Sequence, residues 1–203
     1  MQDAALGALA FGCLVYLATS WCGRVARLGV RTGTLGVAAL RASLCVAAAL
    51  TGGILLAHAA PPATIFSIAI LCTALGATCF LAALDCRVPA AIPGVALAIL
   101  AGAGLLRGDF GPLLSACVTG APFAATTLFA RRSGSDWRDA VVAALGGAAF
   151  GLPLGLFVAA FACLALAFAR PYLARRRPRP PARFSSALAG TFLVVLVGQL
   201  AIS

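Results

Sequence analysis

Two short polar stretches carry the residues whose types and spacing could do chemistry. Asp85-Cys86-Arg87 and Asp136-Trp137-Arg138 each place a carboxylate two residues before a guanidinium, and each stretch lies between two long apolar runs. Two carboxylates that are held close together cannot both ionise cheaply, so they share one proton. The ionised member can activate a water molecule while the protonated member polarises a peptide carbonyl. A pair formed by Asp85 and Asp136 could therefore hydrolyse an amide bond without a metal and without a nucleophilic Ser or Cys.

The chain offers few other groups for catalysis. All 15 basic residues are Arg, and the five acidic residues are all Asp: Asp3, Asp85, Asp109, Asp136 and Asp139. The single histidine, His58, stands before a Pro-Pro pair and is expected at a segment boundary on the side opposite Cys86. The eight cysteines show no zinc-ligand spacing, so we expect no metal, cofactor or disulfide framework. Seven of them fall within or at the end of apolar runs, where a cysteine behaves as a small apolar residue. An Asp-x-Arg at the end of an apolar run can equally be a boundary anchor whose charges neutralise each other.

The composition is that of a membrane protein. The 203 residues are 63% hydrophobic and only 10% charged, with a mean hydropathy of +1.07, whereas soluble domains are typically about a quarter charged. The length suffices for roughly six to eight membrane segments and leaves no soluble domain. The net charge of +10 could suggest nucleic acid, but clustered Arg in a membrane protein marks cytoplasmic connections. We therefore expect the lipid bilayer, and no nucleic acid, as a partner.

The apolar runs predict an all-α, polytopic transmembrane bundle of about eight segments. Residues 140–169 are too long for one span, because a straight helix would rise about 45 Å through a core of roughly 30 Å. It would also place the basic residues 170–183 outside, so we split it at Gly151-Leu152-Pro153 into a hairpin of short helices. The predicted segments are about 4–22, 42–60, 63–84, 92–106, 113–130, 140–152, 153–169 and 186–202.

The arginines predict the orientation of these segments. Arg24, Arg27, Arg31 and Arg41 follow the first segment, and the Pro/Arg stretch Pro171–Arg183 reads as another cytoplasmic loop. Both termini are then outside the cytoplasm. Nearly all Arg residues lie on the cytoplasmic side, with Arg107 as the exception, and Asp109 falls on the outer side. Asp85 and Asp136 both fall at the cytoplasmic edge.

The order of these features resembles the type IV prepilin peptidases, aspartic proteases of the GxGD class, in their short form with only the peptidase region. In that family an Asp ends one span and is followed by a basic residue and Ile-Pro-Asn, which here looks like Asp85, Arg87 and Ile92-Pro93-Gly94. A Gly-x-Gly-Asp-x-Lys motif and an Ala/Gly-rich run follow about fifty residues later. Here Ser133–Arg138 and Ala143–Gly147 look similar.

The resemblance implies a membrane aspartic endopeptidase that cleaves the leader peptide of pilin-like precursors at the cytoplasmic face of the bacterial inner membrane. Asp85 and Asp136 would be catalytic, and Arg87, Arg138 and Asp139 would bind substrate or tune the electrostatics, with Asp139 expected to balance Arg138. The resemblance covers about residues 64–203. We therefore divide the chain into residues 1–62, an N-terminal pair of segments with a basic cytoplasmic loop, and 63–203, a prepilin-peptidase-like membrane domain.

The motif also departs from the family pattern. Ser133 and Ser135 replace the two glycines, Arg138 replaces the Lys, and Gly94 replaces the Asn after the proline. These changes keep open an inactive relative that serves as a membrane component of a pilus or secretion assembly. A small transporter is the other alternative.

Overall fold

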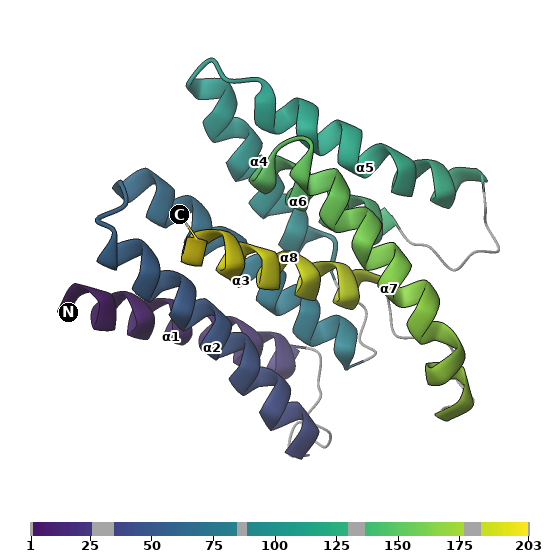
Figure 1. Ribbon diagram of the computed structural model, residues 1–203, viewed down its shortest axis with the longest axis horizontal. Helices are drawn as coiled ribbons and strands as arrows, with labels where there is room; N and C mark the ends of the chain where they lie inside the picture. Colours follow the sequence, from purple (N-terminus) through teal and green to yellow (C-terminus); the bar gives the residue numbers. More distant parts are fainter. Residues whose placement is uncertain (1, 26–34, 85–88, 130–136, 177–183, 203) are drawn as a thin grey trace.

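The computed structural model describes residues 2–25, 35–84, 89–129, 137–176 and 184–202 of the chain (Figure 1). These residues form eight α-helices and no strand, which confirms the predicted all-α class for the described part of the chain. The helices are α1 (Gln2–Val25), α2 (Leu35–Ala57), α3 (Pro62–Ala83), α4 (Ala91–Leu106), α5 (Gly111–Phe129), α6 (Trp137–Phe150), α7 (Leu154–Arg176) and α8 (Phe184–Ile202).

The predicted break in the long apolar stretch 140–169 is present. Helix α6 ends at Phe150 and α7 begins at Leu154, and Gly151 between them has φ +69°. Glycine reaches this left-handed conformation without the steric penalty that a Cβ brings, so the chain can reverse there. Two helices of 14 and 23 residues therefore replace one long helix, so the predicted break is confirmed, whereas the second helix is longer than predicted.

Two helix boundaries differ from the prediction. Helix α2 begins at Leu35 and not near Ala42, so Arg41 lies inside the helix and not in the loop before it. Helix α7 continues through Pro171 to Arg176, where a loop was predicted. The prediction took Arg41 and Pro171 as residues that end a helix. Both are tolerated, because the Ala, Leu and Arg residues around them are strong helix formers.

Four helices form the centre of the bundle. Helix α3 contacts α4 and α8, and α6 contacts the same two helices, so the four close into a ring in which α3 and α6 lie on opposite sides. Helices α1 and α2 pack as a pair against α3 and α8, and α5 packs along α6. Figure 1 shows the α1–α2 pair at the lower left of the bundle and α5 at its upper right.

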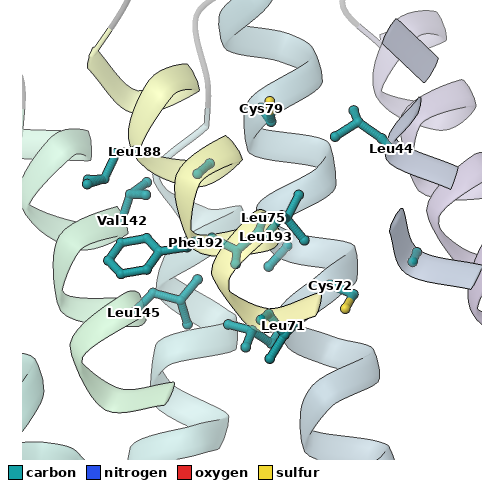
Figure 2. Close-up of a cluster of buried hydrophobic side chains, with 14 of the residues drawn as sticks. Leu44, Leu71, Cys72, Leu75, Cys79, Val142, Leu145, Leu188, Phe192 and Leu193 are labelled. Atoms are coloured by element: carbon teal, nitrogen blue, oxygen red, sulfur yellow. The ribbon is translucent and has the colours of Figure 1, made fainter. Parts of the chain in front are cut away.

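The centre of the ring is filled by apolar side chains, with Phe192 of α8 at its middle (Figure 2). Phe192 is fully buried and points toward Val142 and Leu145 of α6. Its ring stacks on that of Phe150, with 5.4 Å between the ring centroids. Gly146 makes room for this ring, because a Cβ there would overlap it. The same packing that joins α8 to α6 therefore depends on the Gly-rich run of α6.

Small residues also let two helix pairs approach closely. A Cβ added at Gly147 of α6 would lie 2.6 Å from the hydroxyl oxygen of Thr119 on α5. A Cβ at Gly7 of α1 would overlap the carbonyl oxygen of Gly52 on α2. Close backbone contact through small residues is how helices associate in membranes, where no hydrophobic force drives them together.

The outer surface is apolar, as expected of a bundle surrounded by lipid. In the described part of the chain, three helices are long and apolar enough to cross a membrane, over Gln2–Arg24, Gly36–Ala57 and Pro62–Ala83. Large apolar side chains face outward on α1 and α7, among them Leu9, Leu17, Phe157, Phe161 and Phe168. Soluble monomers rarely expose so many large apolar side chains, so this surface supports a membrane protein. Shorter apolar helices cover Ala91–Leu106, Leu154–Ala165 and Ala187–Ile202, and their crossing of the membrane stays a prediction.

The bundle has two distinct ends. One, the turn end, holds the three short connections, 57–62, 106–111 and 150–154, and both chain termini (Figure 1). The other, the basic end, holds the last residues of α1, α3, α5 and α7 and the first residues of α2, α4, α6 and α8. Arg24 at the end of α1 and Arg138 at the start of α6 lie at this basic end.

Candidate functional site

Three of the predicted site residues, Asp85, Arg87 and Asp136, lie outside the described residues. The helix ends that border them are described. The backbone N–H of Leu84 closes α3 by donating to the Phe80 carbonyl at 3.2 Å, and the half-exposed Trp137 opens α6. Both helix ends lie at the basic end of the bundle (Figure 1). The pairing of Asp85 with Asp136 stays a prediction.

Asp139 is a buried carboxylate at the same end. It is the third residue of α6 and is only 4% exposed. The hydroxyl of Ser185, the second residue of α8 and itself buried, donates a hydrogen bond to Asp139 Oδ1. The two residues are 46 positions apart in the chain. This bond therefore fastens the first turn of α6 to the first turn of α8.

The local sequence explains why Asp139 is buried. It precedes Ala143 and Gly146 by four and seven residues, so all three lie on the inner face of α6. The unpaired N–H groups at the start of a helix favour a carboxylate in its first turn. A buried carboxylate also requires hydrogen-bond donors, and Ser185 supplies one from the neighbouring helix.

Sequence reasoning identified Asp139 but missed Ser185. The expected balance between Asp139 and Arg138, which is half-buried, stays a prediction. The spacing of Asp139 from Ala143 and Gly146 could have indicated an inward-facing carboxylate. Nothing in the sequence could have indicated that the facing hydroxyl comes from the start of α8.

The remaining polar groups of the described helices do not complete a different catalytic site. His58 is exposed at the turn end, where its Nδ1 lies 2.9 Å from the Ile54 carbonyl oxygen at the end of α2, as expected of a boundary residue. Because His58 lies at the opposite end from the Ser185–Asp139 pair, this pair lacks the imidazole base that a serine nucleophile needs. Asp109 is also exposed at the turn end, where its Oδ1 accepts a hydrogen bond from the Gly111 N–H at 2.8 Å. Its predicted position away from the candidate site is thereby confirmed.

The cysteines of the described residues are all free thiols. Cys72 and Cys79 are buried in the core along α3, which confirms their predicted role in packing. Within the described ranges, no group of three or more His, Cys, Asp or Glu side chains could hold a metal ion.

Comparisons with protein-family models, with curated proteins and with solved structures found no match to this chain.

Proposed function

We propose that the protein is a membrane aspartic endopeptidase that cleaves the leader peptide of pilin-like precursors at the cytoplasmic face of the bacterial inner membrane. Asp85 and Asp136 act as the catalytic pair. The ionised carboxylate takes a proton from water, which attacks the scissile carbonyl, and the protonated carboxyl donates a proton to the departing amine. Arg87 and Arg138 tune the charge of the pair.

The observation that carries this proposal is the position of the two helix ends that border the aspartates. Helix α3 ends at Ala83 and α6 begins at Trp137, and these ends lie on the same side of an apolar bundle. The two helices belong to one packed ring, in which α4 and α8 each contact both of them. The basic residues Arg24 and Arg138 at this end support a cytoplasmic orientation.

The Asp139–Ser185 hydrogen bond adds support from within the site. Asp136 immediately precedes the first residue of α6, and the bond holds that first turn against α8. Positioning of a catalytic group within a fraction of an ångström is a large part of catalytic rate. A helix start that is fixed to its neighbour is suited to carry one member of a catalytic pair.

The substrate would reach the site from the membrane. A pilin-like precursor is anchored by an apolar helix, and such a helix can pack against an apolar outer face rich in small residues. The outer faces of α1 and α7 combine exposed small residues, among them Ala5, Ala10, Ala160 and Ala165, with larger apolar side chains.

The test is co-expression of the protein with a candidate pilin precursor in a host that lacks its own prepilin peptidase. Asp85→Asn and Asp136→Asn should each reduce the rate of leader cleavage about 10²–10⁴-fold, the usual contribution of an acid or base group. Asp109→Asn is the matched control, because Asn keeps the acceptor that caps Gly111 at the turn end, and cleavage should remain at the wild-type rate. Wild-type cleavage by either dyad variant would exclude the proposed pair.

A further inference from the structure

We propose that Arg41 and Ser20 bind the phosphate of a membrane phospholipid between α1, α2 and α3, in the leaflet at the basic end. This site is independent of the proposed peptidase activity and uses residues of the first two helices, which the catalytic proposal does not employ.

Arg41 is held between two aromatic rings. Its guanidinium carbon lies 5.0 Å from the ring centroid of Phe80 on α3 and 5.7 Å from that of Tyr16 on α1. Phe80 is fully buried, so the guanidinium is anchored on its inner side, whereas Tyr16 is half-exposed. Rings that pack on the guanidinium fix the position of the charge and leave its N–H groups to seek acceptors elsewhere.

Among the described residues, two buried donors of α1 and α2 have no acceptor. Arg41 Nε and Ser20 Oγ are both buried atoms without a hydrogen-bond partner among the described residues. Ser20 lies one helical turn after Tyr16, on the same face of α1, and Arg41 lies over the Tyr16 ring. No carboxylate of the described residues contacts Arg41. Both groups therefore lie near Tyr16, and we infer that they are close enough to donate to one anion.

The energies favour an anionic partner over an unpaired cation. A cation–π contact stabilises the guanidinium only in part. A buried donor without an acceptor is costly, and so is an unpaired charge within an apolar helix. Phosphate oxygens match the guanidinium edge and accept from a hydroxyl as well, so one phosphate group would satisfy both donors.

The depth of the site indicates a lipid headgroup as the source of the phosphate. Arg41 follows Leu35, the first residue of α2, by a rise of about 9 Å, and its side chain leans back toward that helix start. Tyr16 and Trp21 on α1 are exposed at this level, and aromatic residues of this kind mark the headgroup region. Leu14 and Leu17, exposed beside them, would face acyl chains. Lipid phosphates are concentrated at this level of the bilayer, whereas a soluble phosphate would have to come from bulk water.

The experiment measures lipid-dependent thermal stability of the purified protein in detergent. The thiols that are exposed in the folded protein, Cys13 and Cys117 among them, are first blocked. A thiol-reactive fluorophore then reports unfolding, because Cys72 and Cys79 are buried until the core opens. Added phosphatidylglycerol should raise the melting temperature of the wild-type protein in a saturable way. Diacylglycerol, which lacks the phosphate, and inorganic phosphate, which lacks the acyl chains, should not.

Variants separate this site from general attraction between a basic protein and an anionic lipid. Arg41→Gln should weaken the apparent affinity for phosphatidylglycerol at least tenfold, and Ser20→Ala should weaken it severalfold. Arg107→Gln removes an Arg at the turn end and should bind as the wild type does. If Arg41→Gln does not fold, Arg41→Lys keeps the charge without the planar fork and should show an intermediate loss.

Three outcomes would overturn the proposal. They are wild-type affinity in Arg41→Gln, an equal shift with diacylglycerol, and a full shift with inorganic phosphate alone. A full shift with inorganic phosphate alone would mean that the site binds a soluble anion and not a lipid.

Discussion

The two ends of the bundle satisfy their polar side chains in different ways. At the turn end, His58 pairs with the carbonyl of Ile54 and Asp109 accepts from the N–H of Gly111, so each bond stays within four residues. At the basic end, the Ser185 hydroxyl of α8 donates a hydrogen bond to Asp139 of α6, which is 46 residues away in the chain. The basic half of the bundle also holds three buried donors, Arg41 Nε, Ser20 Oγ and Thr78 Oγ1, with no acceptor among the described residues.

This difference indicates that the turn end only connects helices, whereas the basic end has polar groups that could bind a ligand. Local hydrogen bonds complete a reversal of the chain and have little capacity left for a ligand. Bonds between distant helices fix their relative positions, and donors left open can receive a partner. The basic end is therefore where we expect both substrate and lipid to bind.

The prediction with the largest expected effect concerns which side of the membrane each end of the bundle faces. A cysteine-free variant would carry a single new thiol, either Asp109→Cys at the turn end or Arg24→Cys at the basic end. A membrane-impermeant maleimide added to intact spheroplasts should label Asp109→Cys nearly completely and leave Arg24→Cys unlabelled. After lysis both should react. Labelling of Arg24→Cys in intact cells would place the basic end outside and remove the proposed cytoplasmic site.

The second effect compares the two described carboxylates that form hydrogen bonds. Asp139→Ala should lower the free energy of unfolding by about 2–3 kcal/mol, because it removes a buried charged hydrogen bond and leaves the Ser185 hydroxyl without that partner. Asp109→Ala should lower it by only about 1 kcal/mol, the usual contribution of a capping side chain.

A double-mutant cycle isolates the bond itself. Unfolding of Asp139→Ala, Ser185→Ala and the combined variant would be followed in mixed micelles of rising denaturing-detergent content. We expect a coupling energy of about 1–3 kcal/mol between Asp139 and Ser185. Additive effects of the two substitutions would mean that the contact does not hold α6 to α8.

The smallest effect concerns the turn end alone. Gly151→Ala places a Cβ at φ +69° and should destabilise the protein by about 1–2 kcal/mol without changing leader cleavage. Gly102→Ala is the matched control, since it lies within α4 with open space around it. Alanine favours the helix there by up to about 1 kcal/mol, so the control should be slightly more stable than wild type. A loss of cleavage in Gly151→Ala with normal folding would show that the turn end takes part in function.

The sequence was sufficient to predict most helices, because long apolar runs have few alternatives to a helix in a membrane. It also predicted the hairpin at Gly151-Leu152-Pro153, where length and charge together exclude one straight span. It failed at Arg41 and Pro171, because a boundary rule for single residues takes no account of the neighbours that stabilise a helix around them.

The candidate site was predictable only in part. Periodicity shows which face of a helix is apolar, and on that basis Asp139 belongs to the inner face of α6. It does not show which helix lies opposite, so Ser185 could not be found before the fold was known. The contact between Arg41 and the Phe80 ring has the same origin, since it depends on how α2 and α3 are placed. Asp85, Arg87 and Asp136 stay predictions from the sequence.

The lengths of α4 and α6 have a further consequence for the membrane around the protein. They have 16 and 14 residues, which correspond to about 24 Å and 21 Å along their axes, against a hydrocarbon layer of roughly 30 Å. Helices α1, α2 and α3, with 22 to 24 residues each, match or exceed that thickness. The middle of α6 is covered by its neighbours, whereas α4 has exposed side chains such as Val95 and Ile99. If α4 crosses the membrane as the sequence predicts, the lipid beside it must thin to match it. We expect such thinning to bring water closer to α4, which follows the first Asp-x-Arg stretch, and to give the protein a preference for bilayers of short-chain lipids.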